Sequence, residues 1–186
     1  TKAQAAGEIA VTFKATIASL PENDVIANEA TVNINDGEIT YETYPGGEVP
    51  DGPTETRLAD LTINKVGKDG ETPITTGSAK FELWRCAAEG DGYKVVGDKL
   101  SAVMDDNVVS EFTTVEGQAS LEGVQVMDWV NGAQVTDSTL CVVETQAPEG
   151  YSLNPAPVKV DYTPDTDDNY AMVVNVVNLT EEEAGG

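Results

Sequence analysis

The sequence predicts an all-β protein built around an immunoglobulin-like antiparallel β-sandwich. Apolar residues tend to alternate with polar ones, as they do in strands that are buried on one face. Glycine, proline, asparagine and aspartate recur at short intervals between these apolar runs and indicate turns. Of the 186 residues, 40% are hydrophobic, which is enough to form a packed core.

The N-terminal part of the chain predicts only a few strands. Apolar residues alternate over 8–17 and 25–34, with Asn28 in an otherwise apolar register, and a third short strand is expected within 38–44. Residues 45–55, "PGGEVPDGPTE", are rich in proline and glycine and indicate a linker. Because two or three strands cannot close a sandwich, we interpret residues 1–56 as the C-terminal portion of a β-sandwich domain plus this linker, and we expect the beginning of that domain to be missing here.

Residues 57–186 are predicted to form one further domain. Seven strand-like runs occupy 60–66, 79–87, 93–99, 119–126, 139–147, 156–162 and 170–178. Residues 104–117 are expected to form a loop or hairpin insertion, and residues 163–169 a turn. Seven short strands in about 125 residues are typical of an immunoglobulin-like sandwich.

Charge and composition exclude several classes of function. The chain has 33 acidic and 10 basic residues, and its net charge of −23 disfavours nucleic acid and anionic membranes as partners. It has no histidine, so it cannot build a Ser-His-Asp triad, a Cys-His pair or a histidine-based zinc site. No run of 18 apolar residues predicts a membrane span, and the first residues do not resemble a signal peptide.

No metal and no cofactor are expected. The acidic turn that contains Asp165, Asp167 and Asp168 lacks the glycine of an EF-hand loop, so it is a weak calcium candidate. Acidic residues are abundant, but nothing marks out a pair of them for glycosidase chemistry.

The two cysteines, Cys86 and Cys141, favour a disulfide. They are far apart in sequence and lack the clustered spacing of zinc ligands. Strand parity directs both away from the core, so a bridge would lie on the outer side of a sheet. On the chain-entropy model it would stabilise the fold by about 4 kcal/mol, and it would indicate an oxidising, extracytoplasmic environment. Two free surface thiols are the alternative.

Three polar residues occupy core-facing positions near the ends of predicted strands. Lys65, Glu144 and Asn178 each continue an apolar stripe, in the strands that begin near residues 60, 139 and 170. Burying an isolated lysine or glutamate costs several kcal/mol unless the group is paired or changes its protonation state. Each residue alone could reach solvent at a strand end, but together the three suggest one shared site.

These elements resemble the Cna protein B-type domains of Gram-positive surface proteins and pilins. The resemblance covers residues 58–180 and includes Lys65 in the first strand, "ETQAPEGY" at 144–151, and Asn178 at the end of the final strand. The motif ExxAPxGY is its most specific part. Residues 26–34 resemble the end of the middle domain of a major pilin shaft subunit.

The resemblance implies a spontaneous isopeptide bond between Lys65 and Asn178, with Glu144 as its catalytic acid. Burial disfavours the charged form of a lysine, so it makes the amine a better nucleophile, and burial likewise favours a protonated glutamate. Such a glutamate would hydrogen-bond to the asparagine carbonyl and polarise it while ammonia leaves. Amine and amide held in contact reach an effective molarity of roughly 10⁵ M or more, which suits a single turnover within one chain rather than an enzyme.

Two alternatives concern the acceptor. Asn175 lies on the opposite face of the last strand and would replace Asn178 if a bulge shifted the register. Residues 178–180, "NLT", also form a glycosylation sequon, which would put Asn178 on the surface; the resemblance to a bacterial family makes the sequon incidental. Asn28 is a candidate second acceptor, whose lysine is expected in the missing part.

The resemblance implies a structural fragment of a major pilus shaft subunit, anchored in the cell wall of a Gram-positive bacterium. Its partners would be neighbouring pilin subunits joined by sortase, together with a host-cell or matrix receptor. No lysine follows the proline of "TYPGGEVP", and the C-terminal "EEEAGG" has no sorting signal, so polymerisation is inferred by analogy. The alternative is an adhesin or stalk module that binds host matrix through exposed aromatic residues such as Trp84, Tyr93 and Trp129.

Overall fold

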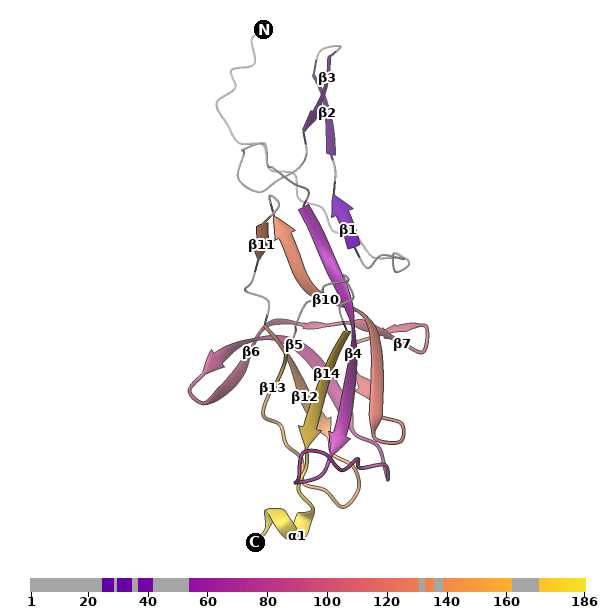
Figure 1. Cartoon of the computed structure of the whole chain (residues 1–186), viewed down its shortest axis with the longest axis vertical. Helices are drawn as coiled ribbons and strands as arrows, with labels where there is room; N and C mark the ends of the chain where they lie inside the picture. The colour runs from indigo at the N-terminus through magenta and orange to yellow at the C-terminus, as the bar shows by residue number, and fades with distance from the viewer. Residues whose placement is uncertain are drawn as a thin grey trace.

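The structure is a computed structural model of the chain, and it describes residues 25–28, 30–34, 37–41, 54–130, 133–135, 139–161 and 171–186 (Figure 1). The predicted strand at 8–17, most of the predicted linker and the predicted turn at 163–169 lie outside these residues. Strands dominate the described part of the chain, so the predicted all-β class is confirmed. No helix within it is long and apolar enough to cross a membrane.

Each of the seven strands predicted after residue 56 is present. They are β4 (Thr54–Val66), β5 (Lys80–Glu89), β6 (Gly92–Leu100), β10 (Gln118–Val130), β12 (Leu140–Gln146), β13 (Val158–Val160) and β14 (Ala171–Val177). The insertion expected at 104–117 contains β8 (Asn107–Val109) and β9 (Phe112–Thr113), and β8 forms a hairpin with β7 (Ala102–Met104). A short strand β11 (Ala133–Val135) pairs with β10, and a single helical turn, α1 (Glu181–Ala184), follows β14.

Two sheets form the sandwich. In the first sheet β4 pairs with β10 on one side, and β10 continues to β7 and β8. The second sheet has the order β13-β12-β5-β6, with β9 also paired to β5. Alternation along the strands fills the space between the sheets, because Leu61 and Ile63 of β4 and Phe81 and Leu83 of β5 are all at most 1% exposed.

The strands β4 and β14 lie side by side and run parallel, although they are the first and last of the seven strands predicted after residue 56 (Figure 1). Their register pairs Val176 with Lys65 and Val177 with Val66. Just beyond the end of β14, the backbone N–H of Asn178 donates a hydrogen bond to the carbonyl of Val66 at 3.0 Å. This pairing brings residues 65 and 178 to the same end of the sandwich.

The segment at 25–34 forms two strands, where the alternation suggested one continuous face. The first, β1 (Val25–Asn28), pairs with residues 54–57 of β4, whereas β2 (Ala30–Ile34) pairs with β3 (Gly37–Tyr41). Alternation could not reveal this change of pairing partner, because the apolar pattern is the same in β1 and in β2. The strand β4 begins at Thr54, inside the predicted linker. The division of the chain near residue 56 stays a prediction.

Candidate functional site

The structure brings Lys65, Glu144 and Asn178 together at one end of the sandwich. Lys65 is the penultimate residue of β4, Asn178 directly follows β14, and Glu144 lies in β12 of the opposite sheet. Their exposed fractions are 0%, 2% and 1%, respectively. The site therefore joins the two sheets and is closed to bulk water.

Glu144 contacts both other residues, one with each carboxylate oxygen. Its Oε1 lies 3.3 Å from the Nζ of Lys65. Its Oε2 accepts a hydrogen bond from the Nδ2 of Asn178 at 2.8 Å. One carboxylate thus touches both the amine and the amide, which is the arrangement needed to move a proton from one to the other.

The amine of Lys65 is buried beside Glu144, the backbone of β14 and the ring of Phe81. Its Nζ also donates to the carbonyl of Val176 at 2.7 Å and lies 5.7 Å from the centre of the Phe81 ring. Burial lowers the pKa of Lys65 from its usual value, although the nearby carboxylate of Glu144 partly opposes this by favouring the charged amine. The lowered pKa raises the fraction of neutral, nucleophilic amine.

The backbone of Lys65 is fixed on both sides. Its N–H donates to the carbonyl of Gly117 at 2.8 Å, and its carbonyl accepts from the N–H of Ile74 at 2.9 Å. Gly117 has φ +83°, and a Cβ at this position would lie 2.5 Å from the carbonyl oxygen of Ile74. Only glycine allows this close approach without a shift of the neighbouring backbone.

The loop after Glu144 supplies two backbone groups that the sequence pattern did not reveal. The carbonyl of Ser152 accepts a second hydrogen bond from the Nδ2 of Asn178 at 2.6 Å. The N–H of Asn154 donates to the Oε2 of Glu144 at 2.9 Å. Side-chain alternation carries no signal for such groups, because every residue except proline has the same N–H and carbonyl.

The amide of Asn178 is oriented differently from what the sequence led us to expect. Glu144 contacts the amide nitrogen, not the carbonyl oxygen. The carbonyl of Ser152 can only accept a hydrogen bond, so it attracts the Nδ2 and turns the Oδ1 away. The buried Oδ1 of Asn178 has no hydrogen-bond partner among the described residues.

The alternative acceptor Asn175 lies outside this site. It is exposed on the outer face of β14, where it accepts a hydrogen bond from Asn64 at 3.1 Å and donates one to the carbonyl of Gly70 at 3.2 Å. Asn178, which is also the first residue of the sequon, is buried. The side chain of Asn28 lies outside the described residues, although its backbone belongs to β1.

The described residues add no support for the calcium candidate or for the aromatic residues of the adhesin alternative. Asp165, Asp167 and Asp168 lie outside the described residues. In the described part of the chain, no group of three or more His, Cys, Asp or Glu side chains could hold a metal ion. The indole of Trp84 donates to Glu82 at 3.0 Å, and the side chain of Trp129 is not among those described.

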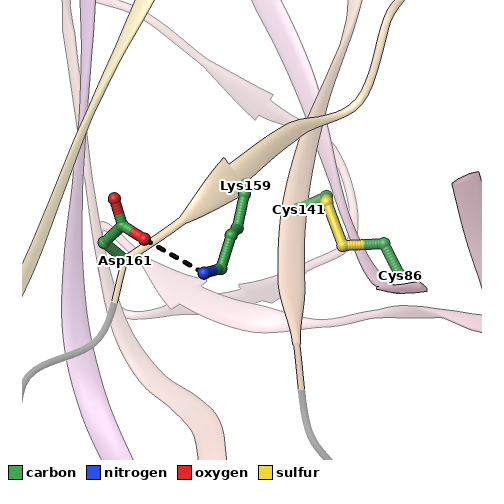
Figure 2. Close-up of a disulfide and its surroundings, with 4 residues drawn as sticks. All are labelled: Cys86, Cys141, Lys159 and Asp161. Atoms are coloured by element: carbon green, nitrogen blue, oxygen red, sulfur yellow. Dashed lines mark ion pairs between the residues drawn. A yellow bond between two sulfur atoms is a disulfide. The ribbon is translucent and has the colours of Figure 1, made fainter. Parts of the chain in front are cut away.

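A disulfide joins Cys86 and Cys141 across the neighbouring strands β5 and β12 (Figure 2). Cys141 pairs with Trp84 in the register, whereas the core residue Val142 pairs with Leu83, so the bridge is on the side of the sheet facing away from the core. Lys159 of β13, which forms an ion pair with Asp161, lies beside Cys141 on this side. Both cysteines are nevertheless buried.

A family model described as the SpaA prealbumin-like fold domain matches residues 59–178. The chain belongs to this family. The match runs from β4 to the residue that follows β14, so all three residues of the buried site lie inside the SpaA-like domain.

Individual relatives of this SpaA-like domain are pilins. The fimbrial subunit type 1 of Actinomyces viscosus is 30% identical over 133 residues, which cover 65% of this chain and 25% of that protein. The solved major pilin SpaA of Corynebacterium diphtheriae is 26% identical with a TM-score of 0.51, over 87% of this chain and 41% of SpaA. These similarities confirm the predicted resemblance to Gram-positive pilin domains.

The fold is shared more widely than the sequence. The major pilin SpaD of Corynebacterium diphtheriae is 23% identical and has a TM-score of 0.53, over 70% of this chain and 34% of SpaD. At this identity the likeness shows the fold alone. The chain spans a quarter of the length of its curated relative and less than half of each of these two pilins.

Proposed function

We propose that the SpaA-like domain locks itself with an isopeptide bond between Lys65 and Asn178 and serves as a structural unit of a pilus shaft on a Gram-positive cell. The observation that carries the proposal is the contact of one buried carboxylate, that of Glu144, with both the amine and the amide. The solved structure of the relative SpaA points to a modular pilus assembly and to stabilising isopeptide bonds in that protein, which supports the same chemistry here.

The chemistry begins with the amine. Oε1 of Glu144 takes a proton from the Nζ of Lys65, and the neutral amine attacks the Cγ of Asn178. A new Nζ–Cγ bond forms and the Cγ–Nδ2 bond breaks. Glu144 passes this proton to the departing nitrogen, with which its Oε2 is already in contact, and then takes a second proton from the Nζ, so that ammonia leaves and a neutral amide remains. The reaction needs no oxidant and no cofactor.

Burial favours each step. The lowered pKa of Lys65 supplies neutral amine. Because the amine and the amide both contact one carboxylate, they are held together and need not meet by diffusion. Water that could compete with the amine is excluded, because all three side chains are at most 2% exposed. The domain reacts once and does not turn over, so it is not an enzyme.

The bond would suit a protein under tension. It would connect the end of β4 directly to the residue after β14, so a pulling force would bypass the strands between them. Pilin subunits joined end to end by sortase carry such a force in series, and this supports the shaft role of the complete protein.

The bond is tested by the intact mass of the reduced chain. We expect the wild type to be lighter than its sequence by one ammonia, and Lys65→Met, Glu144→Gln and Asn178→Ala to have their full masses. The matched control is Asn175→Ala, since this exposed asparagine lies three residues from the acceptor and should leave the deficit intact.

Peptide mapping of the wild type gives an answer that does not depend on the folding of any variant. A cross-linked peptide that contains both Lys65 and Asn178 is expected. A wild-type chain with its full mass would refute the proposal. A mass deficit that vanishes in Asn175→Ala would show that the acceptor is Asn175 and not Asn178.

A further inference from the structure

The loop that follows Glu144 is fastened to the tail that follows Asn178. The N–H of Ser152 donates to the carbonyl of Leu179 at 2.9 Å, and the N–H of Glu181 donates to the carbonyl of Gly150 at 3.2 Å. Between these two bonds, Tyr151 and Thr180 form an antiparallel bridge. Residues 150–152 and 179–181 therefore make a miniature ladder outside the two main sheets.

The loop that this ladder fastens carries the two backbone groups that touch the reacting side chains. The carbonyl of Ser152 binds the Nδ2 of Asn178, and the N–H of Asn154 binds the Oε2 of Glu144. Ser152 uses its N–H for the tail and its carbonyl for the acceptor, so the same residue connects both. A displacement of the loop would release the amide and the carboxylate together.

Side-chain burial contributes little to holding the loop in place. Tyr151, Ser152 and Asn154 are only partly buried, and Leu153 is 48% exposed. The tail, by contrast, has a defined shape, because Thr180 and Glu183 form a capping box at the start of α1. Backbone pairing with the tail is therefore a main restraint on the loop.

We propose that residues 179–181 are a latch that positions the loop 150–154 over the site, so that bond formation depends on the chain beyond the acceptor. This inference rests on the proposed isopeptide bond. Ser152 and Asn154 act as positioning residues, through their backbone groups. The acceptor amide then reaches its reactive orientation only after β14 and the tail have both docked, which ties the covalent step to completion of the fold.

The sharpest test removes one ladder hydrogen bond and little else. Glu181→Pro deletes the N–H that binds Gly150, and proline is well tolerated at the first position of a helix. Thr180 has φ −60° and ψ 158°, which is the conformation favoured before proline. The matched control is Glu181→Ala, which removes the same exposed side chain but keeps the N–H.

The rate of ammonia loss is followed by mass spectrometry after cell-free synthesis of the 186-residue chain. Because a net hydrogen bond contributes about 0.5–1.5 kcal/mol, we expect Glu181→Pro to react roughly two- to twelvefold more slowly than the wild type. Glu181→Ala should react at the wild-type rate. In a second pair, Ser152→Pro removes the other ladder N–H and Ser152→Ala keeps it. Ser152→Pro should again react more slowly than its alanine control.

The outcomes separate this inference from the proposed bond. Equal rates within both pairs, with normal ammonia loss in the wild type, would overturn the latch alone. No ammonia loss in the wild type would overturn the bond and the latch with it. To exclude a loss of folding, the same pairs are compared in the unreactive Glu144→Gln background, where thermal midpoints well above the assay temperature are expected for both members.

Discussion

Lys65 should make the stability of the unlinked domain depend on pH, because its amine is fully buried. The pKa of Lys65 is lowered in the folded state, whereas in the unfolded state it takes its usual value of about 10.4. Between these two pKa values the unfolded chain binds more protons than the folded one. Stability therefore rises with pH through this window.

We expect this slope in the Glu144→Gln chain, which cannot form the bond and also lacks the carboxylate that favours the charged amine. Its free energy of unfolding should rise as the pH increases toward the unfolded-state lysine pKa of about 10.4, by up to about 1.4 kcal/mol per pH unit. The control is the double variant Lys65→Met with Glu144→Gln, which has no amine at this position. Urea unfolding at several pH values measures both, and parallel curves would contradict the expectation.

The side chains of the site could be predicted from the sequence, but its complete geometry could not. Lys65, Glu144 and Asn178 could be predicted because each is a polar residue at a core-facing position of an otherwise apolar strand face. The opposite parity of Asn175 likewise agrees with its exposed position. Ser152 and Asn154 could not be found, because they act through backbone groups. The orientation of the Asn178 amide depends on the Ser152 carbonyl and was missed for the same reason.

The turn at Val115–Gln118 fixes the end of β4 from the neighbouring strand. The N–H of Val115 and the carbonyl of Gln118 close it at 2.8 Å, and its Gly117 accepts the hydrogen bond from Lys65. At Gly117 the turn also packs against the backbone of Ile74, which leaves no space for a side chain. The position of Lys65 thus depends on a glycine in a different element.

Gly117→Ala should therefore destabilise the domain more than a glycine substitution in open space. The matched control is Gly70→Ala, since Gly70 has a similar φ of +75° but a Cβ there would meet nothing within 4 Å. We expect about 1–2 kcal/mol for the left-handed backbone in both variants. A further 1–3 kcal/mol or so is expected for the overlap at Gly117 alone. Urea unfolding in the Glu144→Gln background measures the difference, and equal losses would show that the close approach has no cost.

At the level of elements, the alternation of apolar residues predicted where strands occur. It did not predict which strands pair, or where pairing makes a strand begin and end. The seven strands of the sandwich follow from their apolar periodicity. The division of 25–34 into β1 and β2, and the start of β4 at Thr54, are set by pairing between distant segments. The register shifts of β10 against β4 near Leu121 and Gln125 likewise leave no trace in a single sequence.

Two covalent links would divide the whole domain into nested loops. The proposed bond encloses the chain between Lys65 and Asn178, and the disulfide between Cys86 and Cys141 closes a loop with a sequence separation of 55 inside it. A force applied before β4 and after Asn178 would then run through β4 alone. The enclosed chain could not extend until a covalent bond broke.

Single-molecule stretching should distinguish three states of the chain. The wild type should release none of the enclosed residues. The Glu144→Gln chain should lengthen by about 200 Å while the disulfide is intact and by about 400 Å after reduction, at roughly 3.5 Å per residue. Asn175→Ala is the control and should behave like the wild type. A wild type that lengthens like Glu144→Gln would show that the two ends are not linked.

The parallel pairing of β4 and β14 also gives the domain a direction. Both strands point toward the end where α1 and the C-terminus lie (Figure 1). The chain therefore enters at one end and leaves at the other, after a net displacement of about 40 Å along the 13 residues of β4. An antiparallel pair would have returned it to its starting point. Copies joined head to tail would add their displacements, so any assembly of them would be polar, with two chemically different ends and every surface feature repeated in one orientation.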